Sequence, residues 1–119
     1  MRRDVRLLVV EDDPVCSKAL STFLSHLGYP VESVTTLHDA EEKLNWQPDY
    51  VLLDLMLPDG SGVDLLKRIR EEHLPMRVAV MTGVHEGPML DEVRELRPER
   101  VYRKPLDIPA MMTWIAKTA

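Results

Sequence analysis

The sequence has one cysteine and no long apolar run. Because Cys16 has no second cysteine to pair with, the chain cannot hold an internal disulfide framework. Its longest apolar runs, such as residues 5–10 interrupted by Arg6, are much shorter than the roughly 18 residues that span a bilayer. The N-terminus also lacks the apolar stretch and small-residue cleavage site of a secretory signal. We therefore predict a cytoplasmic protein that does not enter a membrane.

The sequence also lacks an excess of basic charge. Its 15 lysine and arginine residues are outnumbered by 20 acidic residues, the formal net charge is −5, and the one basic cluster at a terminus is Arg2 and Arg3. Because nucleic-acid binding needs a basic face, this balance argues against direct binding of DNA or RNA. The histidines are scattered without zinc-ligand spacing, and we expect them on the surface or in loops: His26, His38, His73 and His85.

The remaining composition is that of an ordinary globular domain. Hydrophobic residues make up 45% of the 119 residues and charged residues 29%. This apolar content supports one buried core, whereas the length is too short for two. We predict a single domain over residues 1–119.

Apolar, β-rich segments alternate with helical patterns along the chain. Each is a nearly continuous apolar run, which is typical of parallel strands buried on both faces. The expected strands are residues 6–10, 31–34, 50–54, 77–81 and 100–103, and the expected helices are residues 14–27, 37–46, 63–72, 88–96 and 108–117. Strand followed by helix, five times over, predicts an α/β fold with a doubly wound parallel sheet and helices on both faces.

The first expected helix begins near Pro14 and stops at Gly28. Leu20, Phe23, Leu24 and Leu27 lie on the expected apolar side of this helix, and Cys16 recurs at helical spacing with Leu20, Phe23 and Leu27. This pattern predicts that all of them face the core and that Cys16 is a small buried hydrophobe rather than a reactive thiol.

Polar residues that can carry chemistry stand where the expected strands end. They are Glu11, Asp12 and Asp13 after the first strand, Asp54 at the end of the third, Thr82 at the end of the fourth, and Lys104 at the end of the fifth. The carboxyl ends of parallel strands form one rim, where ligands of such sheets bind. Clustered carboxylates repel one another unless a cation compensates, and oxygen-only ligands suit Mg²⁺. A facing lysine would complete a site for a phosphoryl group, with Asp54 as nucleophile and Thr82 as a hydroxyl donor.

Each of these residues also has a purely structural interpretation. Asp12 or Asp13 can equally cap the first helix, and Asp54 can cap a loop. Thr82 can close a turn, and Lys104 can be a solvated charge. Their joint occurrence at successive strand ends favours a shared site.

Four segments resemble the receiver domain of response regulators. They are LLVVEDDP at 7–14, VLLDLMLPDGSG at 51–62, MTG at 81–83 and KP at 104–105, and the resemblance covers essentially the whole chain. It implies a flavodoxin-like sheet of five parallel strands in the order 2-1-3-4-5.

The resemblance also implies roles for the rim residues. Asp54 is the expected phosphoacceptor. Mg²⁺ is the expected cofactor, bound by Asp12, Asp54 and the backbone carbonyl of Met56, with Glu11 acting through metal-bound water. Thr82 and Lys104 are the expected contacts to the phosphoryl group. The implied partners are a sensor histidine kinase or phosphotransfer protein, and a downstream protein target or an effector domain outside this stretch.

Two alternatives stay open at this point. A receiver fold can serve as an interaction module without phosphorylation, although its usual mark, a lost acceptor or lysine, is absent here. A true hydrolase would need a second acid two residues after Asp54, where Met56 stands. We therefore expect no enzyme activity beyond self-phosphorylation and slow dephosphorylation.

The sequence departs from the family pattern near its end. Family members usually carry an aromatic residue three positions before the lysine, where this chain has Val101, and the aromatic residue comes one position later, at Tyr102. Because side chains of a strand alternate between faces, Tyr102 should point away from the side of Val101. A homodimer through the last strand and its two flanking helices is also expected, from an apolar surplus at Met89, Leu90, Met111, Met112 and Trp114.

Overall fold

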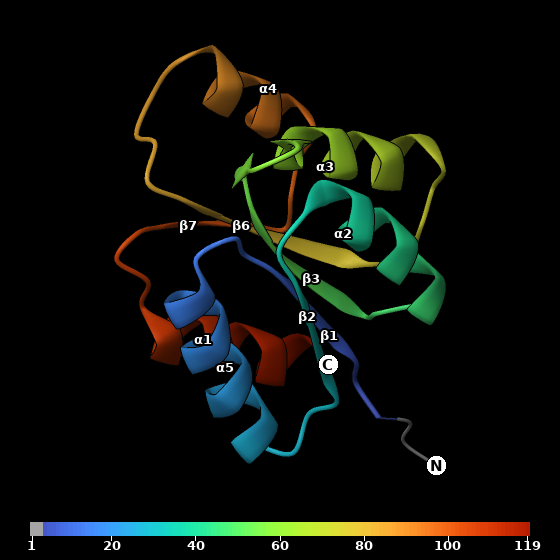
Figure 1. Cartoon of the computed structure of the whole chain (residues 1–119), viewed down its shortest axis with the longest axis vertical. Helices are drawn as coiled ribbons and strands as arrows, with labels where there is room; N and C mark the ends of the chain where they lie inside the picture. The colour runs from blue at the N-terminus through green and yellow to red at the C-terminus, as the bar shows by residue number, and fades with distance from the viewer. Residues whose placement is uncertain (1–3) are drawn as a thin grey trace.

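A parallel sheet forms the centre of the molecule, and the computed structural model describes residues 4–119 (Figure 1). The strands are β1 (Leu7–Val10), β2 (Val31–Val34), β3 (Tyr50–Asp54), β6 (Arg77–Thr82) and β7 (Arg100–Arg103). They lie in the order β2-β1-β3-β6-β7, which is 2-1-3-4-5 when the strands of this sheet alone are counted. The predicted α/β fold and strand order are confirmed.

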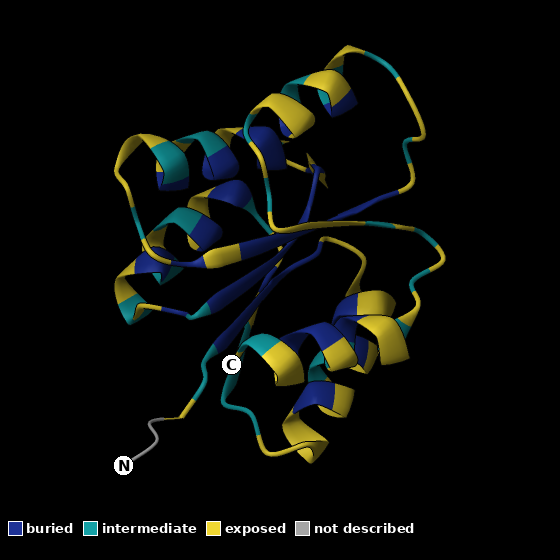
Figure 2. Cartoon of the chain, turned by 180° about the vertical axis from the view of Figure 1, so that it is seen from behind, coloured by how far each residue is buried: buried dark blue, intermediate teal, exposed yellow. Residues whose placement is uncertain are grey.

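Helices cover both faces of the sheet (Figures 1 and 2). On one face lie α1 (Pro14–His26) and α5 (Ile108–Thr118), and on the other lie α2 (Leu37–Lys43), α3 (Gly62–Glu71) and α4 (Pro88–Glu95). A short 3₁₀ turn, η1 (Leu44–Trp46), continues α2. A two-stranded hairpin of β4 (Met56–Leu57) and β5 (Gly60–Ser61) was not predicted, and it shapes the loop after β3.

The side chains of the central strands alternate between two cores. Leu8, Val10 and Leu53 belong to the core under α2, α3 and α4, whereas Leu7 and Leu52 belong to the core under α1 and α5. All of them are fully buried, which explains why each central strand reads as a continuous apolar run. The two cores hold the strands in place and therefore fix where their carboxyl ends lie.

The prediction for Cys16 was wrong, because this residue is exposed. Phe23 and Leu27 are also exposed, whereas Leu20 and Leu24 are buried as predicted, together with Ser17. The reason is that a polar residue takes the inward position. The Ser17 hydroxyl forms a hydrogen bond of 2.6 Å with the Ser33 hydroxyl of β2, which offsets the cost of burying it.

Other surface predictions can also be compared with the structure. All four histidines are exposed, as expected. Within residues 4–119, no helix combines the length and apolar character that a membrane crossing requires. The basic pair Arg2 and Arg3 lies outside the described residues.

The apolar surplus expected on the last strand and its flanking helices is mostly absent from the surface. Leu90, Met111 and Trp114 are buried, and Met89 and Met112 are half-buried against the two cores. Self-association through this face stays a prediction.

Candidate functional site

Three acidic side chains meet at the carboxyl ends of β1 and β3. These strands are neighbours, so Glu11, which follows β1, lies beside Asp54, which ends β3. Both are almost fully buried, with 2% and 5% of their surface exposed, whereas Asp12 is exposed. One carboxylate oxygen from each of the three residues lies within 4.8 Å of the others. The structure thus brings together the acids that were predicted to share a site.

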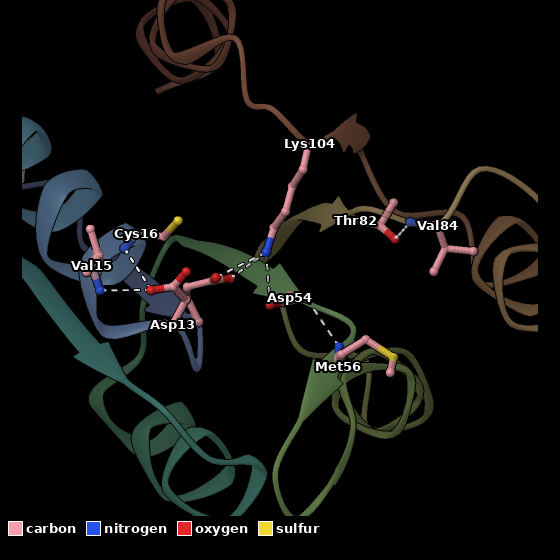
Figure 3. A network of polar contacts seen from close by, with 9 residues as sticks. Asp13, Val15, Cys16, Asp54, Met56, Thr82, Val84 and Lys104 are labelled. Atoms are coloured by element: carbon pink, nitrogen blue, oxygen red, sulfur yellow. Dashed lines mark hydrogen bonds and ion pairs between the residues drawn. The ribbon is translucent and has the colours of Figure 1, made fainter.

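Lys104 reaches these acids from the other side of β6. Its Nζ atom donates hydrogen bonds of 3.0 and 3.2 Å to the two carboxylate oxygens of Glu11 and one of 3.1 Å to Oδ2 of Asp54 (Figure 3). One ammonium group therefore bridges two buried carboxylates. A lysine that is only a solvated charge would not make these contacts.

Burial and charge act in opposite directions on the two ends of this bridge. Burial first, and then the neighbouring Asp54, raise the pKa of Glu11 to about 7 against the lowering effect of Lys104. For Lys104, burial by itself lowers the pKa, but the hydrogen bonds to Glu11 and Asp54 outweigh it and raise the pKa. One ammonium group thus leaves Glu11 only partly compensated.

The acidic triplet after β1 divides between two tasks. Asp13 caps α1, because its Oδ1 accepts hydrogen bonds from the backbone N–H of Val15 at 2.9 Å and of Cys16 at 3.4 Å (Figure 3). These hydrogen bonds hold the pKa of Asp13 below its ordinary value. Glu11 and Asp12 remain for the site, so both interpretations of the triplet hold for different members.

Thr82 lies at the end of β6 and is almost fully buried. Its Oγ1 accepts a hydrogen bond of 2.9 Å from the backbone N–H of Val84, which leaves the hydroxyl proton for another acceptor. Its carbonyl accepts a hydrogen bond of 2.8 Å from the N–H of Lys104. The predicted pair of Thr82 and Lys104 is therefore joined through the backbone.

The loop after Asp54 is held close to this residue. The N–H of Met56 donates a 3.2 Å hydrogen bond to Oδ1 of Asp54, and the Met56 side chain is 60% exposed (Figure 3). Gly62 packs so tightly that a Cβ atom there would lie 2.3 Å from the carbonyl oxygen of Asp54. Gly62 therefore positions the acceptor.

Asp59 has a role that sequence reasoning missed. Its carboxylate accepts hydrogen bonds from the backbone N–H groups of Leu37 and His38 at 2.7 and 3.0 Å, and so caps α2 from a distant loop. These bonds, His38 first, lower the pKa of Asp59. No local pattern could have linked residue 59 to residue 37, because the contact depends on how the loop after β3 folds.

The geometry sets what this rim can do. Three carboxylates face one ammonium group, so a further cation would compensate the excess negative charge of the cluster. The oxygen-only donor set suits a hard divalent ion. Asp54 presents a carboxylate between that cluster and a lysine, the surroundings in which a carboxylate can accept an anionic group.

Comparisons with known proteins agree with this arrangement. The family model described as "Response regulator receiver domain" matches residues 7–116. Two curated relatives are the "Probable transcriptional regulatory protein TcrX" of Mycobacterium tuberculosis and the "DNA-binding dual master transcriptional regulator RpaA" of a Synechocystis strain. The first is 37% identical over 66% of this chain and 34% of that protein, and the second is 28% identical over 90% and 46%. The chain thus spans about a third to a half of the length of these relatives.

Solved structures of receiver domains superpose closely on this chain. The signal receiver domain of a LuxO repressor protein from Vibrio parahaemolyticus has a TM-score of 0.87 and 26% identity, covering 96% of this chain and 88% of that one. A CheY-like receiver domain protein from Methanospirillum hungatei has a TM-score of 0.90 at 23% identity, covering 97% and 93%, and supports the fold alone. Together with the family match over residues 7–116, these findings show that the chain belongs to the response regulator receiver domain family of two-component systems.

Proposed function

We propose that Asp54 accepts a phosphoryl group from a histidine kinase or phosphotransfer protein in a Mg²⁺-dependent reaction, and that the acceptance switches contacts with a downstream partner. The observation that carries this proposal is the single ammonium group of Lys104 in contact with Asp54 and Glu11. A structural salt bridge would pair one acid with one base, whereas here Asp12 adds a third carboxylate to the cluster.

The donor set at the rim fits Mg²⁺. Asp12 and Asp54, with the backbone carbonyl of Met56, would bind the ion directly, and Glu11 would act through a water molecule. When bound, the ion would neutralise the negative charge that develops on the phosphoryl oxygens. The raised pKa of Glu11 is consistent with an acid that awaits a cation.

The residues of the chain have separate tasks in the transfer. A carboxylate oxygen of Asp54 attacks the phosphorus atom, an O–P bond forms, and the P–N bond to the donor imidazole breaks. The imidazole nitrogen keeps the electron pair of the broken P–N bond and takes up a proton from solvent water, which balances the step. Lys104 neutralises one phosphoryl oxygen, and Thr82 donates its free hydroxyl proton to another.

Phosphorylation by a small donor tests this proposal. Incubation with acetyl phosphate and Mg²⁺ should add one phosphoryl group, measured by intact mass, and Asp54→Asn should remove the gain. Asp59→Asn is a matched control, because this acid lies five positions later and caps α2 instead of joining the site. A mass gain that survives in Asp54→Asn would contradict the proposal.

Magnesium binding has its own test. We expect weak binding before phosphorylation, because few protein ligands are available and Mg²⁺ dehydrates reluctantly. Titration followed by backbone NMR should first perturb residues 11–13 and 54–57. Perturbations centred elsewhere, or unaffected by Asp12→Ala and Asp54→Ala, would remove the assignment.

The alternative functions make different demands on the same rim. An interaction module that is never phosphorylated has no need for an acceptor and a lysine in hydrogen-bond contact, and this chain has both. A hydrolase would need an acid in place of Met56, so we propose that turnover of external phosphate esters is absent. The expected lack of direct nucleic-acid binding, the self-association and the cytoplasmic location remain predictions.

A further inference from the structure

Tyr102 packs on the opposite face of β7 from Val101. In the register of β6 and β7, Tyr102 lies beside Met81 and Val101 lies beside Val80. Met81 belongs to the core under α1 and α5, whereas Val80 belongs to the core under α2, α3 and α4. The predicted alternation is therefore confirmed. On this side of β7 the position of the usual aromatic residue holds Val101, which is 40% exposed and has no ring.

Tyr102 starts a chain of aromatic contacts that runs under α5. Its ring centroid lies 6.5 Å from that of Trp114, at an interplanar angle of 60°. Trp114 in turn meets Tyr50 of β3 edge to face, at 5.2 Å and 89°. The hydroxyl of Tyr50 forms a hydrogen bond with that of Thr118, at the end of α5. We call Tyr102, Trp114 and Tyr50 the α5 aromatic chain.

The α5 aromatic chain begins at Tyr102, close in sequence to the site residues. Tyr102 precedes Lys104 by two positions, and its register partner Met81 immediately precedes Thr82. The backbone N–H of Lys104 is also bonded to the carbonyl of Thr82. Any displacement of the lysine or threonine toward a group on Asp54 must therefore act on the strand segment that carries Tyr102.

The first turn of α5 has room to respond. A hollow of about 520 Å³ lies between α1 and the start of α5, and Met81, Lys104, Leu106 and Ile108 are among its lining residues. Close-packed interiors resist displacement, because every shift creates clashes or voids. An open space beside Lys104 removes this resistance on the α5 side of β7.

We propose that Tyr102 and Trp114 transmit the state of Asp54 to α5, so that α5 rather than α4 is the principal element that responds to phosphorylation. This inference rests on the proposed function, because it needs a phosphoryl group on Asp54. That group draws Lys104 away from Glu11 and onto the phosphoryl oxygens. The end of β7 follows, the Tyr102 ring moves against Trp114, and α5 settles in a position with different contacts in the two states.

Fluorescence of Trp114 tests the proposal. The background is Trp46→Phe, since Trp46 lies far along the chain beside Arg6 and would add an unrelated signal. Acetyl phosphate and Mg²⁺ should shift the Trp114 emission in protein whose intact mass shows one added phosphoryl group. The same treatment of the Trp46→Phe, Asp54→Asn variant should leave the emission unchanged.

Three variants at the end of β7 separate transmission from general packing. Tyr102→Leu should still gain the phosphoryl mass but lose the emission shift, whereas Tyr102→Phe keeps the ring and should retain it. Val101→Ala, the neighbour on the other face, is the matched control and should also retain it. A phosphorylated protein without an emission shift, or a shift that persists in Tyr102→Leu, overturns the inference alone. Absence of any mass gain overturns the proposed function and the inference with it.

Amide hydrogen exchange on the unmutated chain gives a second measurement. Phosphorylation should change exchange in peptides covering Ile108–Thr118 more than in those covering Pro88–Glu95. The opposite ranking would overturn the inference even if the Tyr102 variants failed to fold.

Discussion

Both ends of the sheet carry buried or half-buried charged groups, but the two ends balance them differently. At the carboxyl ends, three carboxylates from Glu11, Asp12 and Asp54 share the ammonium group of Lys104. At the amino ends, the backbone N–H of Arg6 donates a 2.8 Å hydrogen bond to Oδ2 of Asp49, and the Arg6 guanidinium donates to the carbonyl of Trp46. At the amino ends, the Asp49 carboxylate and the Arg6 guanidinium thus have hydrogen-bond partners within the protein. At the carboxyl ends, three carboxylates share a single ammonium group.

A second amino-end cluster shows the same balance. Glu99 accepts a hydrogen bond of 2.6 Å from the backbone N–H of Val78 and pairs with Arg70 at 3.1 Å. Arg70 also donates to the carbonyls of Leu96 and Arg97, and so ties α3 to the end of α4. We call this network saturated, because each of its charged groups has partners of opposite charge or hydrogen-bond partners, and such a network stabilises the fold. The cluster at the rim is unsaturated, because it holds more carboxylates than cations, and a bound cation would stabilise it. This difference predicts how the two ends respond to mutation.

The largest effect is expected where the rim backbone is most crowded. Gly62→Ala should lower the free energy of unfolding by about 3 kcal/mol, because its Cβ would lie 2.3 Å from the carbonyl oxygen of Asp54 and the backbone must shift. Phosphoryl uptake should fall as well. Gly83→Ala is the matched control, since a Cβ there has nothing within 4 Å. Urea unfolding measures the stability of both variants, and equal stability would contradict the prediction.

Removing Glu99 from the network at the amino ends should lower the stability of the protein without affecting its phosphorylation. Glu99→Ala leaves the N–H of Val78 and the guanidinium of Arg70 without this acceptor, and should lower the free energy of unfolding by about 2 kcal/mol. The gain of phosphoryl mass should be unchanged in the folded protein. Glu95→Ala, an exposed residue of α4, serves for comparison. If Glu99→Ala blocked phosphorylation at full stability, the division between the two ends would be wrong.

The unsaturated end should also make stability depend on pH. Burial raises the pKa of Glu11 to about 7 in the folded protein, above its ordinary value of 4.5, so the folded state holds a proton that the unfolded state releases between these values. The contribution of Glu11 to stability is therefore complete below about pH 4.5 and is lost as the pH rises through about 7. In metal-free buffer, Glu11→Gln should flatten this slope. A slope that is the same in both proteins would assign it to other groups.

Removing one carboxylate from the rim should raise the stability of the protein, whereas removing Glu99 lowers it. Asp12→Asn takes away a carboxylate within 4.8 Å of two others, and should stabilise the metal-free protein by about 1 kcal/mol. Added Mg²⁺ should then raise the melting temperature less than it does for the unmutated chain. Thermal melts with and without Mg²⁺ check both statements, and a destabilised metal-free Asp12→Asn would contradict the first.

Most of the fold could be predicted because its signals are local. The bounds of β3 agree with the apolar run at 50–54, since strands buried on both faces tolerate few polar residues. The burial of α1 could not be read in this way. The hydrogen bond between the buried Ser17 and Ser33 joins two elements that the helical pattern treats separately.

The candidate site shows the same division. Convergence of Glu11, Asp54 and Lys104 follows from their positions at strand ends in a parallel sheet, and their contacts agree with it. Whether Asp12 or Asp13 caps α1 depends on a backbone turn at the helix start, which residue type alone does not decide. The close approach of Gly62 to Asp54 depends on the β4–β5 hairpin, which was not predicted from the sequence.

The smallest expected effect concerns the lifetime of the phosphorylated rim. Hydrolysis of an acyl phosphate needs a water molecule in line with the leaving carboxylate, and polar side chains can hold it there. Met56 and Val84 flank the site without offering such a bond from their side chains (Figure 3). Because Met56 is 60% exposed, its side chain is not simply filling a gap between loops. We therefore expect slow spontaneous dephosphorylation.

A double variant at these two positions should shorten the lifetime. Met56→Asn with Val84→Glu adds polar groups that can position water, so release of radiolabelled phosphate should become severalfold faster at unchanged Mg²⁺ affinity. The backbone bond from Val84 to Thr82 does not involve the replaced side chain and should persist. If Lys104 and the metal alone set the rate, both proteins would lose phosphate equally fast. In that case the apolar flanks would have no part in the difference between the rim and the saturated end of the sheet.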